Sequence, residues 1–340
     1  MAKKGLRYNQ VTSHYKNDTN TQRMTLKNTI VDFEILIDDF FINVNPGSTL
    51  TPVDKKKVLS VINDFQDGNW RYSKFQAFIW DNIVETSLSY KDRLALIDRS
   101  QSSLTEAAKK LRLTDLAKEQ DGQGSELAEI VLYGIMKHHY KALPVVPKIF
   151  YKQNPQDNAK GADSVHIVIE DENNFSIWFG EAKFYNSIED ERLYSIVDSV
   201  ENSLQTEKLE KENSIITSVS DLKLYLDEDS DLYKNIIGFI KTGASIDNLK
   251  PILHIPILLL HECAITERSN ELTDEYRQQI ISHHKDRAES YFKKQISKVS
   301  KSIFKYSEIH FHLILFPVPK KEPIVSAFVE NVQLYKKQGN

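Results

Sequence analysis

Residues 163–183 read DSVHIVIEDENNFSIWFGEAK, and this stretch decides the fold. Polar and apolar residues alternate along 163–169 and again along 175–183, which is the pattern of half-buried β-strands. The four residues Asp171-Glu172-Asn173-Asn174 between the two runs are typical of a turn. The sequence therefore predicts an antiparallel β-hairpin over this stretch.

The register of this hairpin decides which side chains meet. Glu181 and Lys183 share one face, because successive side chains of a strand point to opposite faces. If Ile169 pairs with Phe175 across a five-residue loop, Asp163 lies opposite Glu181 on that same face. A four-residue loop without a bulge would place Asp163 on the other face. We predict the first register, which gathers two carboxylates and one ammonium group at the open end of a sheet.

These three side chains predict a metal site. Two close carboxylates repel each other unless a cation lies between them, and their hard oxygen atoms favour Mg²⁺ or Mn²⁺. Beside such an ion, Lys183 would orient or deprotonate a water molecule, or stabilise charge on a phosphate group. The alternative interpretation is a surface hairpin with a cross-strand ion pair.

The segments around the hairpin predict a mixed α/β domain over residues 121–320. Ser125 caps an expected helix with Glu126 and Glu129 in its first turn. The other expected elements are a strand at 145–151, a helix at 189–209, a polar insertion at 210–250, a strand at 252–260, a helix at 273–306 and a strand at 309–316. The order of strands and helices indicates a central mixed sheet flanked by helices.

The first 120 residues predict a mostly helical region. Its segments 52–65, 72–87 and 90–120 are rich in helix formers, with apolar residues three and four positions apart. Four aromatic residues in this region are interpreted as core packing, with partner docking as the alternative: Tyr72, Phe75, Phe78 and Trp80. Residues 321–340 are expected to be a C-terminal tail.

Composition limits the classes of function. The 340 residues carry a net charge of −4, so the chain lacks the overall basic excess of many DNA-binding proteins. A nucleic-acid enzyme with this balance needs a local basic stripe, a divalent metal ion or a partner that supplies the grip. The single cysteine, Cys263, excludes an internal disulfide and a cysteine-based zinc site. The start Met-Ala-Lys-Lys and the short aliphatic runs predict a cytoplasmic protein with no signal peptide or membrane helix.

An acid on one strand followed by Glu-x-Lys at the end of the next resembles the signature of PD-(D/E)XK nucleases. The corresponding residues are Gly161-Ala162-Asp163 and Gly180-Glu181-Ala182-Lys183, with Ala162 in place of the proline that gives the motif its name. The resemblance implies a restriction-endonuclease-like core in which Asp163, Glu181 and the Ala182 carbonyl hold Mg²⁺ and Lys183 acts on the attacking water. In that superfamily an acid on the first core helix often completes the metal site, which implies Glu129 or, alternatively, Glu126.

Three segments narrow the resemblance further: 125–133, 160–166 and 178–185. Together they resemble the HamA family, the nuclease subunits of Hachiman anti-phage defence systems. The resemblance implies cleavage of DNA that is held in check by the helicase HamB, in a heterodimer, until phage infection or DNA damage releases it. Two alternatives stay open: a non-catalytic regulatory subunit of a helicase complex, and a nuclease that cuts RNA.

A lysine stripe is the candidate grip on DNA. In the helix expected at 273–306, lysines recur at spacings of four, three and four, opposite an apolar face: Lys294, Lys298, Lys301 and Lys305. Lys160, next to Gly161, is a further candidate phosphate contact. The alternative interpretation of the stripe is a solvated helix face.

Overall fold

The computed structural model describes residues 29–30, 33–113, 124–147, 149, 162–219, 222–240 and 245–338. Its centre is an eight-stranded sheet in the order β1-β2-β3-β10-β9-β8-β7-β6. The strands are β1 (Thr29–Ile30), β2 (Phe33–Phe40), β3 (Lys56–Ile62), β6 (Leu143–Val146), β7 (Ser164–Ile169), β8 (Phe175–Tyr185), β9 (Leu253–Glu262) and β10 (His310–Val318). β3, β10, β9 and β8 run parallel, and the outer strands are antiparallel to their neighbours, so the sheet is mixed.

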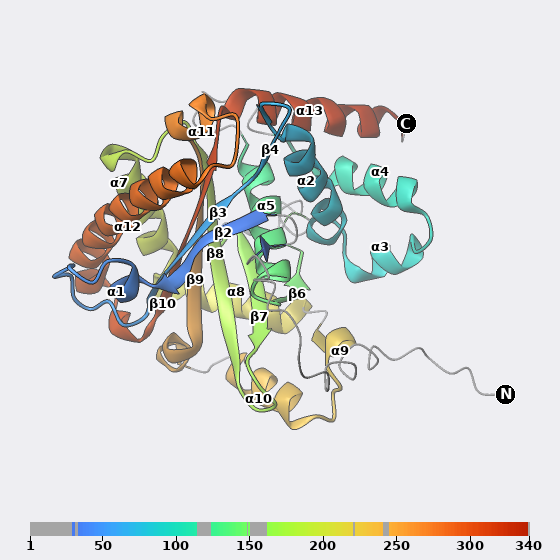
Figure 1. Ribbon diagram of the computed structural model, residues 1–340. Helices are drawn as coiled ribbons and strands as arrows, with labels where there is room; N and C mark the ends of the chain where they lie inside the picture. The colour runs from blue at the N-terminus through green and yellow to red at the C-terminus, as the bar shows by residue number, and fades with distance from the viewer. Residues whose placement is uncertain are drawn as a thin grey trace, which may run out of the picture.

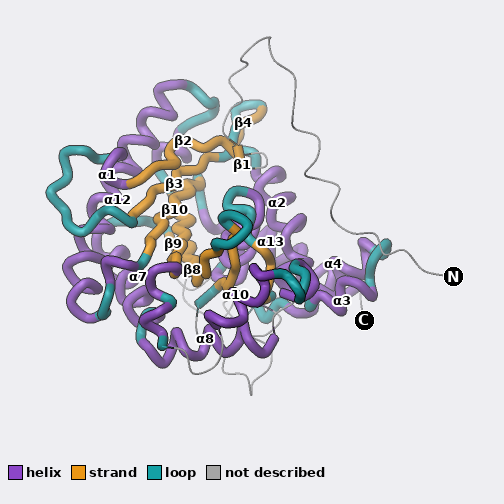
Figure 2. Tube along the Cα trace, turned by 90° about the horizontal axis from the view of Figure 1, so that it is seen from below, coloured by secondary structure: helices purple, strands orange, loops and turns teal. Residues whose placement is uncertain are grey.

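Helices cover both faces of the sheet (Figure 1). One face carries α7 (Asp190–Ser203) and α12 (Asp274–Ser302), and the other carries α2 (Tyr72–Ser87), α5 (Ser125–His138) and α13 (Lys321–Gln338). The view from below shows the same layers (Figure 2). The remaining helices are α1 (Phe41–Val44), α3 (Tyr90–Ala95), α4 (Ser100–Lys110), α8 (Thr206–Val219), α9 (Leu222–Tyr225), α10 (Asp231–Ile240) and α11 (Ala264–Arg268). A two-stranded hairpin, β4 (Phe65–Gln66) with β5 (Asn69–Trp70), follows β3.

The covered sheet explains the continuous aliphatic run in the middle of β9. In β9, Ile257 and Leu259 pack in the core on the α7 and α12 side, whereas Leu258 and Leu260 pack in the core beneath α2 and α5. A parallel strand buried on both faces has no solvent side and therefore reads as a continuous apolar run. The structure confirms the strands expected at 252–260 and 309–316, and the mixed α/β class.

The helix expected at 52–65 is wrong for residues 56–62, and residues 33–40, which lie in the same region outside the expected helices, are also a strand. These residues form β2 and β3, which belong to the central sheet, although the helix expected at 72–87 is confirmed as α2. β3 pairs in parallel with β10, far away in the chain, and its β-branched residues Val58, Val61 and Ile62 favour a strand. Core packing is confirmed for Phe75 and Phe78, which are buried and make edge contacts with aromatic rings of the sheet.

Two further segments differ from expectation. Residues 321–338 are not a tail but the helix α13, which packs against α2 and α4. The strand expected at 145–151 is β6, which ends at Val146; residues 148 and 150–161 lie outside the described part of the chain. The polar insertion contains α8, α9 and α10.

Candidate active site

The hairpin adopts the predicted register. Ile169 pairs with Phe175, and β7 begins where Ser164 pairs with Gly180. One residue earlier, the backbone N–H of Asp163 donates to the Gly180 carbonyl at 2.7 Å. The carboxylate of Asp163 in turn accepts the backbone N–H of Ala182 at 3.0 Å. These bonds attach Asp163 to the neighbouring strand at the position of Glu181.

Asp163, Glu181 and Lys183 meet at this point. The Lys183 Nζ lies 3.0 Å from Glu181 Oε2 and 3.5 Å from Asp163 Oδ2, so the ammonium group contacts both carboxylates. Glu181 is buried, and its Oε2 also accepts the hydroxyl of Ser199 on α7 at 3.0 Å. The structure therefore brings together the three side chains that the sequence places on one face.

Burial and neighbouring charges both shift the pKa values of Glu181 and Lys183. Burial raises the pKa of the Glu181 carboxyl, the charge of Asp163 raises it further, and the Lys183 ammonium opposes both. Burial alone would lower the pKa of Lys183, but the two adjacent carboxylates outweigh it and raise that pKa above its usual value. Lys183 is therefore a cation held between two anions.

The candidate residues lie on both faces of the hairpin. Glu181 and Lys183 are on the face that packs against α7, as the bond from Ser199 shows, together with Phe179 in the same core. Ala182 and Trp178, on the alternate positions, pack in the core beneath α5. Any acid contributed by α5 must therefore approach the strand ends from the opposite face to Glu181.

Glu129 makes that approach. It is buried on α5 and lines a cavity of about 10 Å³ that Asp163 also lines. The other lining residues are Thr86, Tyr133, Val146, Ile149 and Ser164. A cavity of this size has room for a single water molecule or a small ion. Asp163, which directly precedes β7, thus contacts Lys183 on one face of the sheet and lines this cavity on the side of α5.

Glu126 lies elsewhere. Its carboxylate accepts the backbone N–H groups of Arg112 at 2.9 Å and Leu113 at 2.8 Å, which follow α4. These contacts join the end of α4 to the start of α5, a structural role. Of the two alternatives for the helix acid, the geometry favours Glu129.

The absence of a side chain at Gly180 lets α5 lie close to the hairpin. A Cβ atom there would overlap the Oγ of Ser164 and lie 2.8 Å from the Leu132 side chain of α5. The glycine that precedes Glu181 therefore has a packing function beside the site.

The donor atoms fit Mg²⁺ in kind. Asp163 and Glu181 offer hard oxygen atoms, and Mg²⁺ commonly binds through one or two carboxylates while keeping several water molecules. Lys183 already shows that a cation is stabilised between them. Within the described ranges, no three His, Cys, Asp or Glu side chains are arranged to hold one ion. The geometry therefore offers a pair of carboxylate ligands, and Glu129 lines a cavity that it shares with Asp163.

The lysine stripe of α12 is divided between two environments. Lys294 pairs with Asp190 at 3.2 Å, and Lys298 pairs with Asp198 at 2.6 Å, so both are bound to acids of α7. The helix expected at 273–306 ends at Ser302, so Lys305 lies beyond α12, where it pairs with Glu308 at 3.5 Å; Lys301 is exposed in the last turn of the helix. The first half of the stripe therefore belongs to a contact between helices, contrary to the expectation of a free basic face. Lys160 lies outside the described residues.

Two residues that lie beside the site were not predicted from the sequence. Ser199 binds Glu181, and Glu212 on α8 accepts the backbone N–H of Ala162 at 3.0 Å. The only local signal for Glu212 is its spacing, since it stands in line with Leu209 and Ile216, which are buried. A carboxylate at a core position of an amphipathic helix is unusual and points to a partner.

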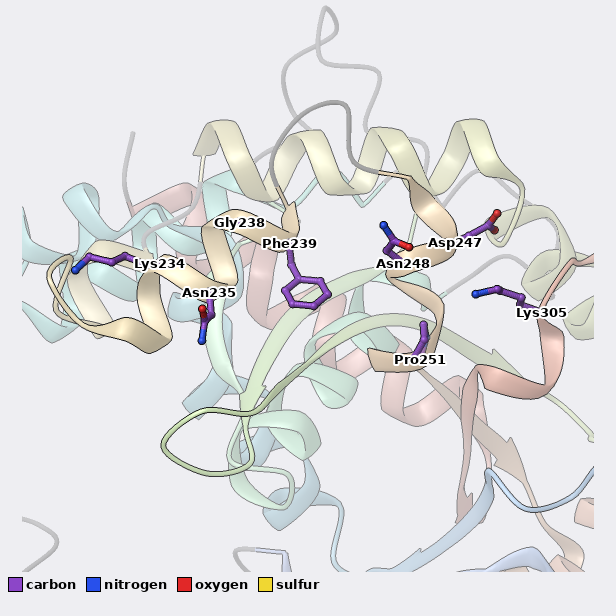
Figure 3. Close-up of a pocket in the computed structure, with 8 residues that line it drawn as sticks. All are labelled: Lys234, Asn235, Gly238, Phe239, Asp247, Asn248, Pro251 and Lys305. Atoms are coloured by element: carbon purple, nitrogen blue, oxygen red, sulfur yellow. The ribbon is translucent and has the colours of Figure 1, made fainter.

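A larger pocket lies at the other end of β8 (Figure 3). Its volume is about 590 Å³, and its lining includes Phe239 of α10 and Lys305. The ring of Phe239 contacts Phe175, the first residue of β8, at a centroid distance of 5.6 Å. The carboxylates of the candidate site do not line this pocket, so the two are separate features.

The sequence as a whole is similar to a known protein family. No helix in the described part of the chain is long and apolar enough to cross a membrane. No curated protein matches the sequence. A family model, that of HamA, matches residues 37–332, which is most of the chain and includes every element of the candidate site. The chain therefore belongs to the HamA family, whose members are components of Hachiman anti-phage defence.

Proposed function

We propose that this protein is a metal-dependent nuclease that hydrolyses phosphodiester bonds of DNA as the effector of a Hachiman system. One observation carries the proposal: Lys183 contacts the carboxylates of both Asp163 and Glu181 at the end of a hairpin in the predicted register. A surface ion pair needs one acid and one base, and it stays exposed. Here Glu181 is only 5% exposed, and a second acid adds repulsion that an interaction surface would not require.

Each residue has a chemical role in this proposal. Asp163 and Glu181, with the Ala182 carbonyl, hold Mg²⁺ or Mn²⁺, and Glu129 orders water on the opposite face of Asp163 or helps to hold a second ion. A bound Mg²⁺ supplies Lewis acidity for the phosphate and lowers the pKa of a bound water. Lys183, an ammonium cation between the two acids, orients the attacking water and stabilises negative charge at the phosphate. The resulting domain has a PD-(D/E)XK-type core.

The charges support a role for a partner. The net charge is −4, and Lys294 and Lys298 are bound to acids of α7, so little of the lysine stripe is available to phosphates. Affinity for DNA comes mainly from cations that contact phosphates. A helicase subunit such as HamB would supply the grip on DNA and hold the nuclease in check.

The proposal is tested by incubating plasmid, single-stranded DNA and RNA with the purified protein in Mg²⁺, Mn²⁺ or EDTA. We expect metal-dependent cleavage of DNA that is lost in Asp163→Asn and Lys183→Met and kept in Lys293→Met, which changes an exposed lysine of α12. Adding the helicase partner should suppress it. Cleavage of RNA alone would replace DNA as the substrate, and cleavage that survives both site variants would refute the site.

A regulatory subunit without nuclease activity is the second candidate. It is favoured by the pairing of Lys294 and Lys298 with α7, which leaves the isolated chain with a weak basic surface. Under this alternative, Lys183→Met changes neither partner binding nor defence against phage. Under the nuclease proposal, the same variant binds the partner and loses defence.

A further inference from the structure

Glu212 is a buried carboxylate outside the motif. It lies on α8, in the segment between β8 and β9, and is 1% exposed. Leu209 and Ile216 lie one turn before and after it and pack in the core. Burial of a carboxylate costs free energy, and an apolar side chain would suit this position at no such cost. The position therefore calls for a specific reason to hold a polar side chain.

The contact of Glu212 supplies that reason. Its Oε1 accepts the backbone N–H of Ala162 at 3.0 Å, and Ala162 is itself buried. Ala162 precedes β7, which begins at Ser164, so its N–H lies beyond the paired register of the hairpin. Without an acceptor from another element, this buried N–H would be unsatisfied.

Besides the contact with Lys183, hydrogen bonds to α8 and to β8 hold the backbone and side chain at Asp163. Glu212 binds the N–H of Ala162, the N–H of Asp163 donates to Gly180 at 2.7 Å, and the Asp163 carboxylate accepts from Ala182 at 3.0 Å. The last two bonds attach Asp163 to β8. The first attaches the preceding peptide to α8, so Glu212 is the contact that fixes the approach of the chain to Asp163.

We propose that Glu212 is a positioning residue of the active site, which acts through the Ala162 amide to hold Asp163 in place for the metal ion. This inference rests on the proposed nuclease function. It also gives α8 a place in the site, because the helix carries the acceptor. The residue does not touch the reacting atoms.

The test compares three variants of the full chain. Glu212→Met fills the core position with an apolar side chain of similar length and removes the acceptor. Glu212→Gln keeps an oxygen acceptor in the same place, and Glu210→Met is the control, because Glu210 is exposed on the same helix. The readouts are Mn²⁺ affinity by calorimetry, hydrogen exchange at the Ala162 and Asp163 amides, and the rate of DNA cleavage.

We expect Glu212→Met to weaken Mn²⁺ binding and slow cleavage by roughly ten- to hundredfold, as loss of an outer contact to a metal ligand commonly does. Exchange at the Ala162 amide should become faster in this variant. Glu212→Gln should stay close to the wild type in all three readouts, and Glu210→Met should match it. Equal losses in the Gln and Met variants, or wild-type Mn²⁺ affinity in the Met variant, would overturn the inference.

If Glu212→Met folds poorly, Ala162→Pro alone tests the same bond, because it removes the N–H and leaves the core side chain of Glu212 in place; it should weaken Mn²⁺ binding to a similar extent, and wild-type affinity would overturn the inference. If Glu212→Met folds, it should cause no further loss of Mn²⁺ affinity in the Ala162→Pro background. Equal effects of Glu212→Met in both backgrounds would overturn the inference. If the wild type neither binds Mn²⁺ nor cuts DNA, the nuclease proposal fails, and amide exchange still reports whether Glu212 holds Ala162.

Discussion

The Nζ of Lys183 lies 3.0 Å from Oε2 of Glu181, and the same oxygen accepts the hydroxyl of Ser199. Asp163 Oδ2 is 3.5 Å from the same ammonium group. The lysine thus neutralises a pair of carboxylates that would otherwise repel each other. A divalent cation entering between them competes with Lys183 for the same oxygen atoms, and its arrival would leave the lysine free to act on water or phosphate.

Removal of the ammonium should therefore separate metal binding from catalysis. In Lys183→Met we expect Mn²⁺ to bind roughly tenfold more tightly, because the competing charge is gone and the carboxylates keep their places. Cleavage should fall by at least about 100-fold, the usual cost of losing a general acid or base. Calorimetric titration with Mn²⁺ and initial rates on supercoiled plasmid measure the two effects. Weaker Mn²⁺ binding in this variant would show that Lys183 supports the metal site instead of competing for it.

Asp163 should be needed both for Mn²⁺ binding and for cleavage. Asp163→Asn keeps the size of the side chain but removes one of two negative charges, so we expect Mn²⁺ affinity and cleavage both to fall, the latter by at least about 100-fold. The amide oxygen can still accept the N–H of Ala162, so the free energy of unfolding should change by less than about 1 kcal/mol. Urea unfolding supplies the control. If Asp163→Asn is unfolded, its loss of Mn²⁺ binding and cleavage says nothing about the site, and Asp163→Glu takes its place in the same assays.

The two halves of the lysine stripe should respond differently to truncation. Lys298 is held by Asp198 at 2.6 Å and Glu201 at 3.1 Å, whereas Lys301 is exposed and, among the described residues, has no carboxylate within ion-pair distance. Lys301→Ala should weaken DNA binding by the complex of this protein with its helicase partner. The slope of log affinity against log salt concentration should fall by the amount expected for about one phosphate contact. Lys298→Ala should leave DNA binding within about twofold. Fluorescence anisotropy at several salt concentrations checks both, and an equal effect of the two substitutions would contradict the division of the stripe.

A buried histidine pair predicts loss of stability in acid. His261 Nδ1 lies 3.1 Å from the Glu262 carbonyl and must donate to it, so its Nε2 accepts from His284 Nε2 at 3.2 Å. His284 Nδ1 then accepts the hydroxyl of Ser60 at 2.7 Å. This chain of hydrogen bonds is complete only when both imidazoles are neutral.

Burial accordingly lowers the pKa of His261 from 6.5 to about 3 and that of His284 well below its usual value. The unfolded chain takes up protons below a pH of about 6.5 and these folded histidines do not, so the free energy of unfolding falls as pH falls. Each histidine contributes a slope of up to about 1.4 kcal/mol per pH unit between pH 6 and 4. Urea unfolding of His284→Gln over this range should show a shallower slope than the wild type, and an unchanged slope would contradict the assignment. His283→Gln, at the half-buried neighbour, should change the slope less.

The structure adopts one of the two hairpin registers that the sequence allowed, the one that brings Asp163 to Glu181 and Lys183, whereas the sequence by itself determined the hairpin and the shared face of Glu181 and Lys183. These follow from side-chain alternation and from the composition of one turn, both of which act over a few residues. The aliphatic strands β9 and β10 were equally clear, because a strand buried on both faces needs an apolar residue at nearly every position.

Only the tertiary structure decided the rest. β3 joins the sheet through a parallel pairing with β10 that no local pattern reports. The contact of Glu126 with the backbone after α4 leaves Glu129 as the acid that approaches Asp163. Likewise, an acid of α7 pairs with Lys298, and α8 places the carboxylate of Glu212 against the backbone N–H of Ala162. In each case the partner lies on another element, and its position is set by the packing of helices on the sheet, which depends on the whole chain.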